Sequence, residues 1–335
     1  MKAFEFINVR DLRSASAALG SDPEQAKILA GGVDLLTELK EHLIEPSRIV
    51  NIKGIRGLDT YRVAANGARI GALVTLSRIE NDRQAWERYT ALAEAARSVG
   101  SPQIRNIGTV GGNLCQRPRC WYYRDEQIKC IKKGGSKCYA ADESANNKYN
   151  AILGGGPSYI VHPSDLATAL VALNARIRYY DAQGRTQEIP AEEFFVLPRV
   201  RVNAENVLRA NEILTEVVIP APRPGTRSTY LKFKEKDSFD WAVAAVAVAA
   251  QIGSDQLIQE VRVVLGGVAP IPWRSPEAEN VLRGKRYTPQ LANEAAEAAL
   301  ARAQPLSMNA YKVPLTKVLI RRALEKVVTG KTLPV

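Results

Sequence analysis

The sequence contains no apolar run long enough to cross a membrane. Its longest apolar stretch, residues 242–250 (AVAAVAVAA), is about half of the ~18 residues that a membrane span requires, and it predicts a buried strand. The first residues, MKAFEFINVRDL, lack the apolar core and the small-residue cleavage site of a secretory signal. Low-complexity tracts and repeats are also missing. We therefore expect a soluble cytoplasmic protein without a membrane span, or a periplasmic one if a partner carries the export signal.

The sequence is also poor in the residues that build a self-contained active site. It has two histidines, His42 and His162, and shows no catalytic dyad, nucleophile elbow or zinc motif. His162 precedes Pro163 and is expected to be a structural turn residue. We therefore expect no catalytic residues in this chain, so that any chemistry would come from a bound cofactor.

Acidic residues are outnumbered, with 35 Asp and Glu against 46 Lys and Arg and a net charge of +11. Seven basic residues fall within residues 117–137, where three aromatic residues, WYY, are interleaved with them. This pattern superficially resembles a surface for single-stranded nucleic acid. The favoured interpretation is a positive field around a bound anion or an acidic partner surface, and we expect no nucleic-acid partner.

The order of strand and helix patterns predicts an α+β protein, and 335 residues suffice for two or three domains. The segments FEFINV and AKILA read as strands, Asp11 as a helix cap, and residues 86–98 as one long amphipathic helix. A second group of strands is followed by two helices after residue 226. Three prolines and a glycine in residues 220–225 indicate a linker. We expect domains at 1–221 and 226–330.

Two glycine-rich turns suggest a site for an extended anionic ligand. In the first, LAGGVDLL, a strand runs into Gly31 and Gly32 and then into a helix, which exposes backbone N–H groups that can hold a phosphate. The second, IGTVGGN, combines three glycines with a threonine and an asparagine. Neither is the G-x-G-x-x-G motif, so a nicotinamide-type Rossmann site is not indicated. Two such turns suit a dinucleotide, whose pyrophosphate and ring system lie far apart.

All four cysteines, Cys115, Cys120, Cys130 and Cys138, fall within 24 residues. Without a secretion signal, disulfides are not expected. Their spacing does not match the paired cysteines of structural zinc sites. Spacing alone therefore identifies no metal, although the clustering favours a cofactor such as an iron–sulfur cluster.

Several motifs occur in one order: AGGVDLL, GTVGGNLC, HPSDLATAL, Tyr230-Leu231-Lys232 and VRVVLGGVAPIPWR. Together they resemble the FAD-binding medium subunits of the molybdenum hydroxylases, the family of xanthine dehydrogenase, aldehyde oxidoreductase and carbon monoxide dehydrogenase. The resemblance covers about residues 3–328. It implies a two-subdomain FAD-binding fold of the vanillyl-alcohol-oxidase type, followed by an α+β domain of the carbon monoxide dehydrogenase flavoprotein type.

The resemblance also implies a function and partners. This chain would be an oxidoreductase subunit that binds FAD without a covalent bond and oxidises no substrate alone. It would take electrons from a small [2Fe–2S] subunit beside a large molybdopterin-binding subunit, in a heterotrimer, and pass them to an acceptor that the sequence does not identify. The alternative is a self-sufficient flavin oxidase, which would need its own acid or base above the flavin.

The resemblance further implies which residues contact FAD. Val99 occupies a position where some relatives have an aromatic residue, and it cannot stack on a flavin. The turns would contact pyrophosphate and ribitol, and three further residues would complete the flavin pocket. The expected cofactor-binding residues are Leu29, Ala30, Gly31, Gly32, Val33, Asp34, Leu35, Leu36, Thr109, Gly111, Gly112, Asn113, Asp165, Leu214 and Lys232.

Residues 114–158 resemble an insertion that holds an additional [4Fe–4S] cluster in some family members. The family pattern would supply Cys120, Cys130 and Cys138, but Ser158 stands where those relatives often have a fourth cysteine. We expect Cys115 to be the fourth ligand in preference to Ser158, because a thiolate binds iron better than a hydroxyl group that must first lose its proton. Loss of the cluster is the remaining alternative.

Overall fold

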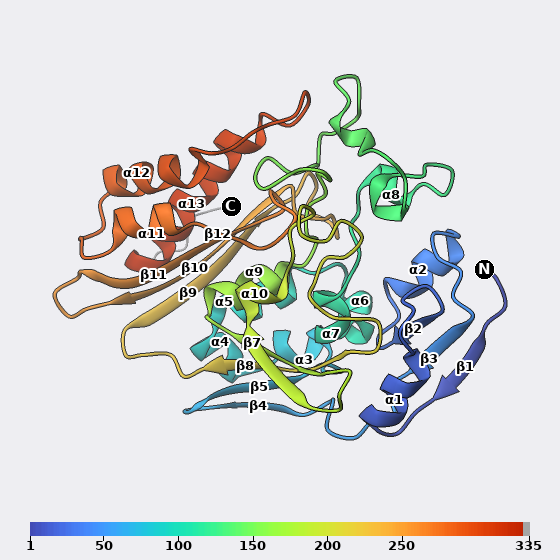
Figure 1. Cartoon of the computed structure of the whole chain (residues 1–335). Helices are drawn as coiled ribbons and strands as arrows, with labels where there is room; N and C mark the ends of the chain where they lie inside the picture. The colour runs from blue at the N-terminus through green and yellow to red at the C-terminus, as the bar shows by residue number, and fades with distance from the viewer. Residues whose placement is uncertain (331–335) are drawn as a thin grey trace.

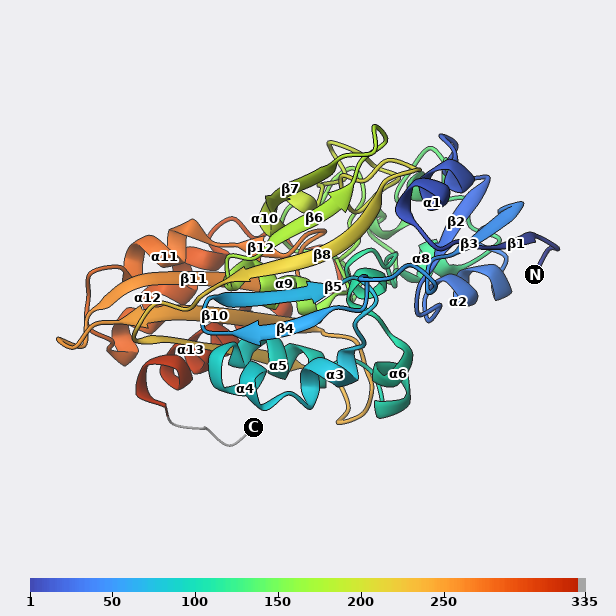
Figure 2. The same ribbon diagram turned by 90° about the horizontal axis from the view of Figure 1, so that it is seen from below.

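The computed structural model describes residues 1–330, which form three sheets in sequence along the molecule (Figures 1 and 2). The first sheet is parallel, with strand order β1-β3-β2, and α1 and α2 belong to the same subdomain. Its elements are β1 (Glu5–Asn8), α1 (Leu12–Leu19), β2 (Ala26–Leu29), α2 (Leu35–Lys40) and β3 (Arg48–Asn51). As expected, Asp11 caps α1, because its carboxylate accepts a hydrogen bond from the Ser14 N–H at 2.7 Å.

The second sheet is antiparallel, with strand order β4-β5-β8-β6-β7. The strands are β4 (Tyr61–Ala64), β5 (Gly67–Gly71), β6 (Arg176–Tyr180), β7 (Thr186–Pro190) and β8 (Ile213–Pro220). The helices of this part are α3 (Leu76–Glu80), α4 (Arg83–Arg88), α5 (Thr90–Arg97), α6 (Pro102–Ile107), α7 (Val110–Leu114), α9 (Asp165–Ala172) and α10 (Ala191–Phe194). The insertion between α7 and α9 contains α8 (Trp121–Arg124) and two 3₁₀ turns, Ile131–Lys133 and Tyr139–Ala141.

The third sheet is antiparallel, with strand order β12-β11-β10-β9. Its elements are β9 (Thr226–Phe233), β10 (Ala244–Ile252), β11 (Ile258–Gly266), β12 (Trp273–Arg274), α11 (Pro276–Leu282), α12 (Pro289–Leu300) and α13 (Lys312–Thr329). The predicted buried strand is β10, and both of its faces are covered. Ala245 and Ala247 share a core with the second sheet, whereas Val246 and Val248 pack with α11–α13. Helices α5 and α9 lie between the two antiparallel sheets (Figure 1).

The α+β fold class is confirmed, but two elements differ from the prediction. The expected helix over residues 86–98 is two helices, α4 and α5, separated at Tyr89, whose φ of −136° is not helical. Tyr89 is fully buried, and its hydroxyl donates to the Pro220 carbonyl at 3.0 Å, so a tertiary contact accompanies the break. The short helix α11 also lies in the C-terminal part, where only two helices were expected.

The segment between Pro220 and Thr226 joins the second sheet to the third, since β8 ends at the first residue and β9 begins at the second. Among residues 1–330, no helix combines the length and the apolar character needed to cross a membrane. The three sheets surround one large cleft, which is the candidate site.

Candidate functional site

A cleft of about 1320 Å³ is lined by residues from all three sheets and from the insertion. Thirteen of the predicted cofactor residues line it: Ala30, Gly31, Gly32, Val33, Asp34, Leu35, Thr109, Gly111, Gly112, Asn113, Asp165, Leu214 and Lys232. The two others do not. Leu29 is buried beneath the first turn, and Leu36 is 42% exposed and does not line the cleft. The structure therefore brings together residues that lie about 200 positions apart in the sequence.

The first glycine turn presents unpaired backbone donors to this cleft. Within residues 1–330, the N–H groups from Gly31 to Leu35 donate to no acceptor, and the first helical bond of this segment runs from Leu36 N–H to the Gly32 carbonyl at 2.9 Å. Gly32 has a φ of +80°, which a residue with a side chain rarely adopts. Consecutive free N–H groups around a concave turn form an anion-binding site. This turn therefore has the geometry expected of a phosphate site.

The two glycine turns touch each other at Gly31. A Cβ atom built there would lie 2.3 Å from the Ile107 carbonyl oxygen and 3.3 Å from the Gly108 Cα. Only glycine permits this approach, because backbone atoms cannot move aside as a side chain can. The contact fixes the position of the first turn relative to α6 and the second turn.

The second turn differs from the first because its backbone donors are paired within the protein. The N–H groups of Val110 and Gly111 donate to the carbonyls of Val74 and Ala72. Those of Gly112 and Asn113 donate to the side-chain and backbone oxygens of Thr109. What remains for a ligand is the open face of Gly112, where an added Cβ would meet only the Thr109 hydroxyl, at 3.1 Å. The Asn113 amide nitrogen also has no acceptor within residues 1–330.

The side chain of Asp34 is fully engaged by the insertion. Its carboxylate accepts from the Arg117 backbone N–H at 2.7 Å and forms ion pairs with Arg119 at 2.9 Å and Arg124 at 2.8 Å. Asp34 therefore anchors the basic insertion to the first glycine turn, and only its backbone N–H is free to face a ligand.

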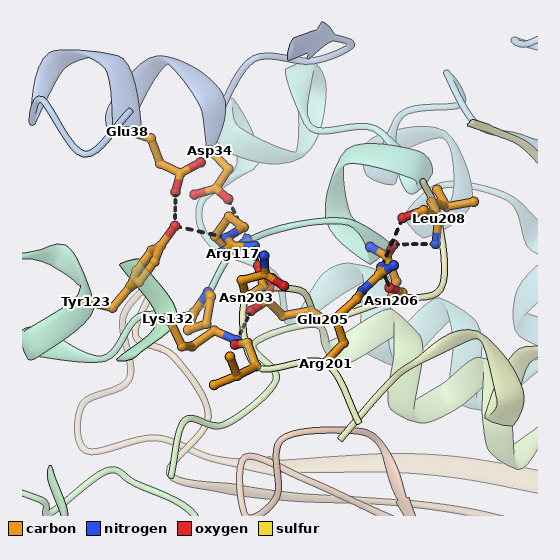
Figure 3. A network of polar contacts seen from close by, with 12 residues as sticks. Asp34, Glu38, Arg117, Tyr123, Lys132, Arg201, Asn203, Glu205, Asn206 and Leu208 are labelled. Atoms are coloured by element: carbon orange, nitrogen blue, oxygen red, sulfur yellow. Dashed lines mark hydrogen bonds and ion pairs between the residues drawn. The ribbon is translucent and has the colours of Figure 1, made fainter. Parts of the chain in front are cut away.

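A second carboxylate, Glu205, extends this polar network across the cleft wall (Figure 3). It pairs with Arg117 at 2.8 Å and with Lys132 at 2.6 Å, and its side chain is almost completely buried. On the other side of Arg117, the Tyr123 hydroxyl accepts from the guanidinium at 2.9 Å and donates to Glu38 at 2.6 Å. Burial raises the pKa of Glu38, and neighbouring Asp34 raises it further.

Sequence reasoning identified the basic residues of this network but not Glu38 and Glu205, which lie far from the insertion in the chain. The network also explains much of the positive charge of the insertion. Arg117, Arg119, Arg124 and Lys132 are paired with the carboxylates of Asp34 and Glu205 at the cleft wall and are not spread over an open surface. This arrangement disfavours a nucleic-acid surface formed by these residues.

At the opposite end of the cleft, Asp165 at the start of α9 meets β9. Its carboxylate accepts from Lys232 at 2.8 Å and from the Tyr230 hydroxyl at 2.5 Å, and Lys232 also donates to the Ser98 carbonyl at 3.0 Å. The side chains of Asp165 and Lys232 are each 4% exposed. Burial and the adjacent carboxylate raise the pKa of Tyr230 well above its usual value. The motif Tyr230-Leu231-Lys232 did not indicate that the Tyr230 hydroxyl donates to Asp165.

The four cysteines are not assembled into one ligand set. Within residues 1–330, no group of three or more Cys, His, Asp or Glu side chains is arranged to hold a metal ion. Cys115 lines the cleft and packs against the apolar core of the second sheet, where desolvation raises its pKa to about 12. Cys120 lines a different pocket. A four-cysteine cluster is therefore not supported, and the identity of the fourth ligand, Cys115 or Ser158, stays a prediction.

Other features of the insertion bear on Ser158, the alternative ligand. Ser158 is 1% exposed, and its hydroxyl has no hydrogen-bond partner within residues 1–330. The side-chain amide of Asn150 donates to the carbonyl of the next residue, Tyr159, at 3.0 Å and lies 3.7 Å from the Cys120 sulfur. Burial raises the pKa of the Cys120 thiol.

His162, the other polar residue near this region, is a buried structural side chain. Its ring packs edge-to-face on Phe195, with centroids 4.7 Å apart, and its Nδ1 accepts from the Ser164 N–H at 3.3 Å. Burial, with smaller contributions from Lys132 and Arg119, lowers the pKa of His162 to about 3. The ring is therefore neutral at ordinary pH, as suits a structural turn residue.

The cleft and the fold can now be compared with known proteins. Residues 2–222 match the FAD-binding domain found in molybdopterin dehydrogenases, and residues 228–327 match the C-terminal domain of carbon monoxide dehydrogenase flavoproteins. The chain therefore belongs to the FAD-binding subunit family of the molybdenum hydroxylases. Within this family it is a medium subunit of the carbon monoxide dehydrogenase and aldehyde oxidoreductase type.

Individual relatives agree with this assignment. The chain is 33% identical to the aldehyde oxidoreductase FAD-binding subunit PaoB of Escherichia coli, over 95% of this chain and 96% of that protein. It is 28% identical to the carbon monoxide dehydrogenase medium chain of Hydrogenophaga pseudoflava, over 96% of each. A solved structure of carbon monoxide dehydrogenase from Hydrogenophaga pseudoflava superposes with a TM-score of 0.76, covering 98% of both chains at 27% identity.

Proposed function

We propose that this chain binds FAD in the cleft and transfers electrons as the medium subunit of a heteromeric molybdenum hydroxylase. The observation that carries the proposal is the run of free backbone N–H groups from Gly31 to Leu35 at one end of a cleft about 1320 Å³ in volume. An FAD pyrophosphate fits such a run, because backbone donors can bind anionic oxygens without a countercharge of their own.

The predicted residues then contact different portions of FAD. The first turn holds the pyrophosphate, while Gly112 and Asn113 face the ribitol region, the glycine by leaving room and the asparagine by its free amide. Asp165, Leu214 and Lys232 surround the flavin end. Bound FAD supplies the redox chemistry, accepting two electrons and releasing them singly or together. We propose that the two domains comprise residues 1–221 and 226–330. Lys232 is then the residue that the C-terminal domain contributes to this pocket.

The proposed partners follow from the relatives. A large molybdopterin-binding subunit would oxidise the substrate, and a small [2Fe–2S] subunit would deliver electrons to the flavin. Full-length similarity to the aldehyde oxidoreductase and carbon monoxide dehydrogenase medium chains supports this assignment over a self-sufficient flavin oxidase.

The test compares the isolated chain with the assembled complex. Apoprotein titrated with FAD should bind it saturably and quench flavin fluorescence, and the reconstituted chain should oxidise no aldehyde or purine. The complex containing all three subunits should oxidise its substrate and reduce the flavin. Robust turnover by the reconstituted chain alone would instead establish the flavin-oxidase alternative.

We also propose a cluster site in the insertion, formed by Cys120, Cys130 and Cys138 with Ser158 as the fourth ligand in preference to Cys115. Cluster binding would have to draw these side chains together, because no three of the cysteines are arranged to hold a metal within residues 1–330. The unpaired, buried hydroxyl of Ser158 supports Ser158 over Cys115. Iron analysis and EPR spectroscopy on the purified chain and on the Cys115→Ala and Ser158→Ala variants test it. Loss of iron in Ser158→Ala with retention in Cys115→Ala is expected. The reverse result would restore Cys115 as the ligand, and iron-free wild-type protein would remove the cluster.

A further inference from the structure

A second, smaller pocket of about 310 Å³ opens beside the cleft. It is built where the insertion meets residues 161–168 and the connection between β9 and β10. Arg119, Asp165, Asp240 and Trp241 line both this pocket and the cleft. These four residues therefore form a common wall between the smaller pocket and the cleft.

Three large aromatic side chains line this pocket, beside polar residues that include Cys120 and Asn150. Trp121 and Tyr149 from the insertion meet edge-to-face, with ring centroids 5.5 Å apart. From the connection between β9 and β10 comes Trp241, with the Arg119 guanidinium 4.4 Å from its ring centroid. Trp121 and Trp241 are 50% and 44% exposed, although large aromatic side chains are usually well buried. Partly exposed rings around a concavity suit a flat aromatic ligand, which could cover them by stacking.

The charges around the pocket balance. Arg119 is paired with Asp34, Asp165 with Lys232, and Glu235 with Lys148 at 2.5 Å. The two remaining charges, Lys236 and Asp240, have opposite signs, and the Asp240 carboxylate accepts from the Lys236 backbone N–H at 3.2 Å. No surplus of positive charge remains to hold a pyrophosphate. This charge balance favours an uncharged ligand over a dinucleotide.

Size leads to the same conclusion. Ligand pockets usually span roughly 300–1,000 Å³, so a volume near the lower limit admits a ring system of one or two rings.

The indole N–H groups of Trp121 and Trp241 have no acceptor within residues 1–330, so each can donate to a carbonyl oxygen of a ligand. Flat shape, small size, neutrality and exposed N–H donors together describe a quinone.

We propose that this pocket binds a neutral one- or two-ring quinone, which is the acceptor for electrons leaving the flavin. This inference rests on the proposed binding of FAD in the cleft. In the balanced reaction, the reduced flavin FADH₂ gives two electrons and two protons to the quinone. The products are oxidised FAD and the quinol. The insertion supplies Trp121 and Tyr149, and it thereby contributes to the choice of acceptor.

The experiment uses the full chain reconstituted with FAD, reduced with dithionite without excess and mixed anaerobically with three oxidants. Reoxidation by menadione, a two-ring quinone, should saturate with concentration. Ferricyanide should react without saturation, and NAD⁺ should react negligibly. In Trp121→Ala, the menadione concentration for half-saturation should rise about three- to tenfold, because one stacking surface is lost. The rate with ferricyanide should not change.

A matched control is Phe6→Ala, because Phe6 on β1 is also 50% exposed but lines neither the pocket nor the cleft. Its menadione kinetics should equal those of the wild type. Unsaturable menadione reoxidation, or kinetics unchanged in Trp121→Ala, would overturn the proposal, as would saturable oxidation by NAD⁺. If the chain binds no FAD, the proposed function fails first. Menadione quenching of tryptophan fluorescence in the FAD-free chain then tests the pocket separately: saturable quenching supports it, and its absence refutes it.

Discussion

Replacing Lys232 by methionine should strongly destabilise the FAD-free protein. The Lys232 ammonium lies 2.8 Å from the Asp165 carboxylate, and both side chains are 4% exposed. Methionine preserves much of the volume but leaves a buried carboxylate with Tyr230 as its remaining side-chain donor. Removing one partner of a buried ion pair typically lowers the free energy of unfolding by about 3–5 kcal/mol. Tyr230→Phe removes one hydrogen bond to a charged group and should lower it by about 1.5–3 kcal/mol.

Urea unfolding of the FAD-free chain measures both changes. The double variant Lys232→Met/Asp165→Asn should be more stable than Lys232→Met alone, because an amide pays a smaller desolvation penalty than an unpaired carboxylate. If Lys232→Met changed the free energy of unfolding by less than about 0.5 kcal/mol, as a surface substitution does, the reasoning from burial would be wrong.

Four further predictions concern the cleft and its surroundings. Gly112→Val should fold but lose most FAD affinity in fluorescence titrations, because its new side chain meets little protein and fills the cleft. Gly31→Ala should instead lower the melting temperature, because its Cβ would overlap the Ile107 carbonyl. In the iron-free chain at pH 8, iodoacetamide should modify Cys115 more slowly than Cys138 in peptide mapping, because burial raises the pKa of Cys115 to about 12. The free energy of unfolding should fall as the pH drops from about 6.5 toward 3, by up to about 1.4 kcal/mol per unit, and less steeply in His162→Asn.

The sign of the pH effect follows from which state binds the proton. The unfolded chain protonates His162 near its ordinary pKa of about 6.5, whereas the folded chain does so near pH 3. Between these values the unfolded state holds more protons, so acid favours unfolding. Above pH 6.5 both states are neutral at this residue, and its contribution is constant.

The local features of the site were predictable from sequence because they depend on neighbouring residues. A strand, two glycines and a helix start are enough to indicate the first turn, and the structure places its free N–H groups in the cleft. The second turn has a similar sequence, yet its N–H groups are paired with Ala72, Val74 and Thr109. Nothing local distinguishes the two turns, because the acceptors at Ala72 and Val74 lie outside the motif.

Longer-range pairings were beyond sequence reasoning. Asp34 was expected to offer its backbone amide to the cofactor, but nothing in the sequence indicated that its carboxylate is held by arginines more than 80 residues away. Glu205 gave no signal of its own, because an isolated glutamate in a loop is ordinarily solvated. Its burial depends on Arg117 and Lys132 arriving from the insertion. Cys115 and Cys120, five residues apart in the sequence, line different pockets, which their spacing did not indicate.

The most direct test of the central claim is an equilibrium titration of the purified, FAD-free chain with FAD, followed by flavin fluorescence and absorbance. The account predicts saturable binding of one FAD per chain, loss of most of this affinity in Gly112→Val, and retention of it in Phe6→Ala. Failure of the folded wild-type chain to bind FAD, or equal affinity in wild type and Gly112→Val, would contradict the assignment of the cleft.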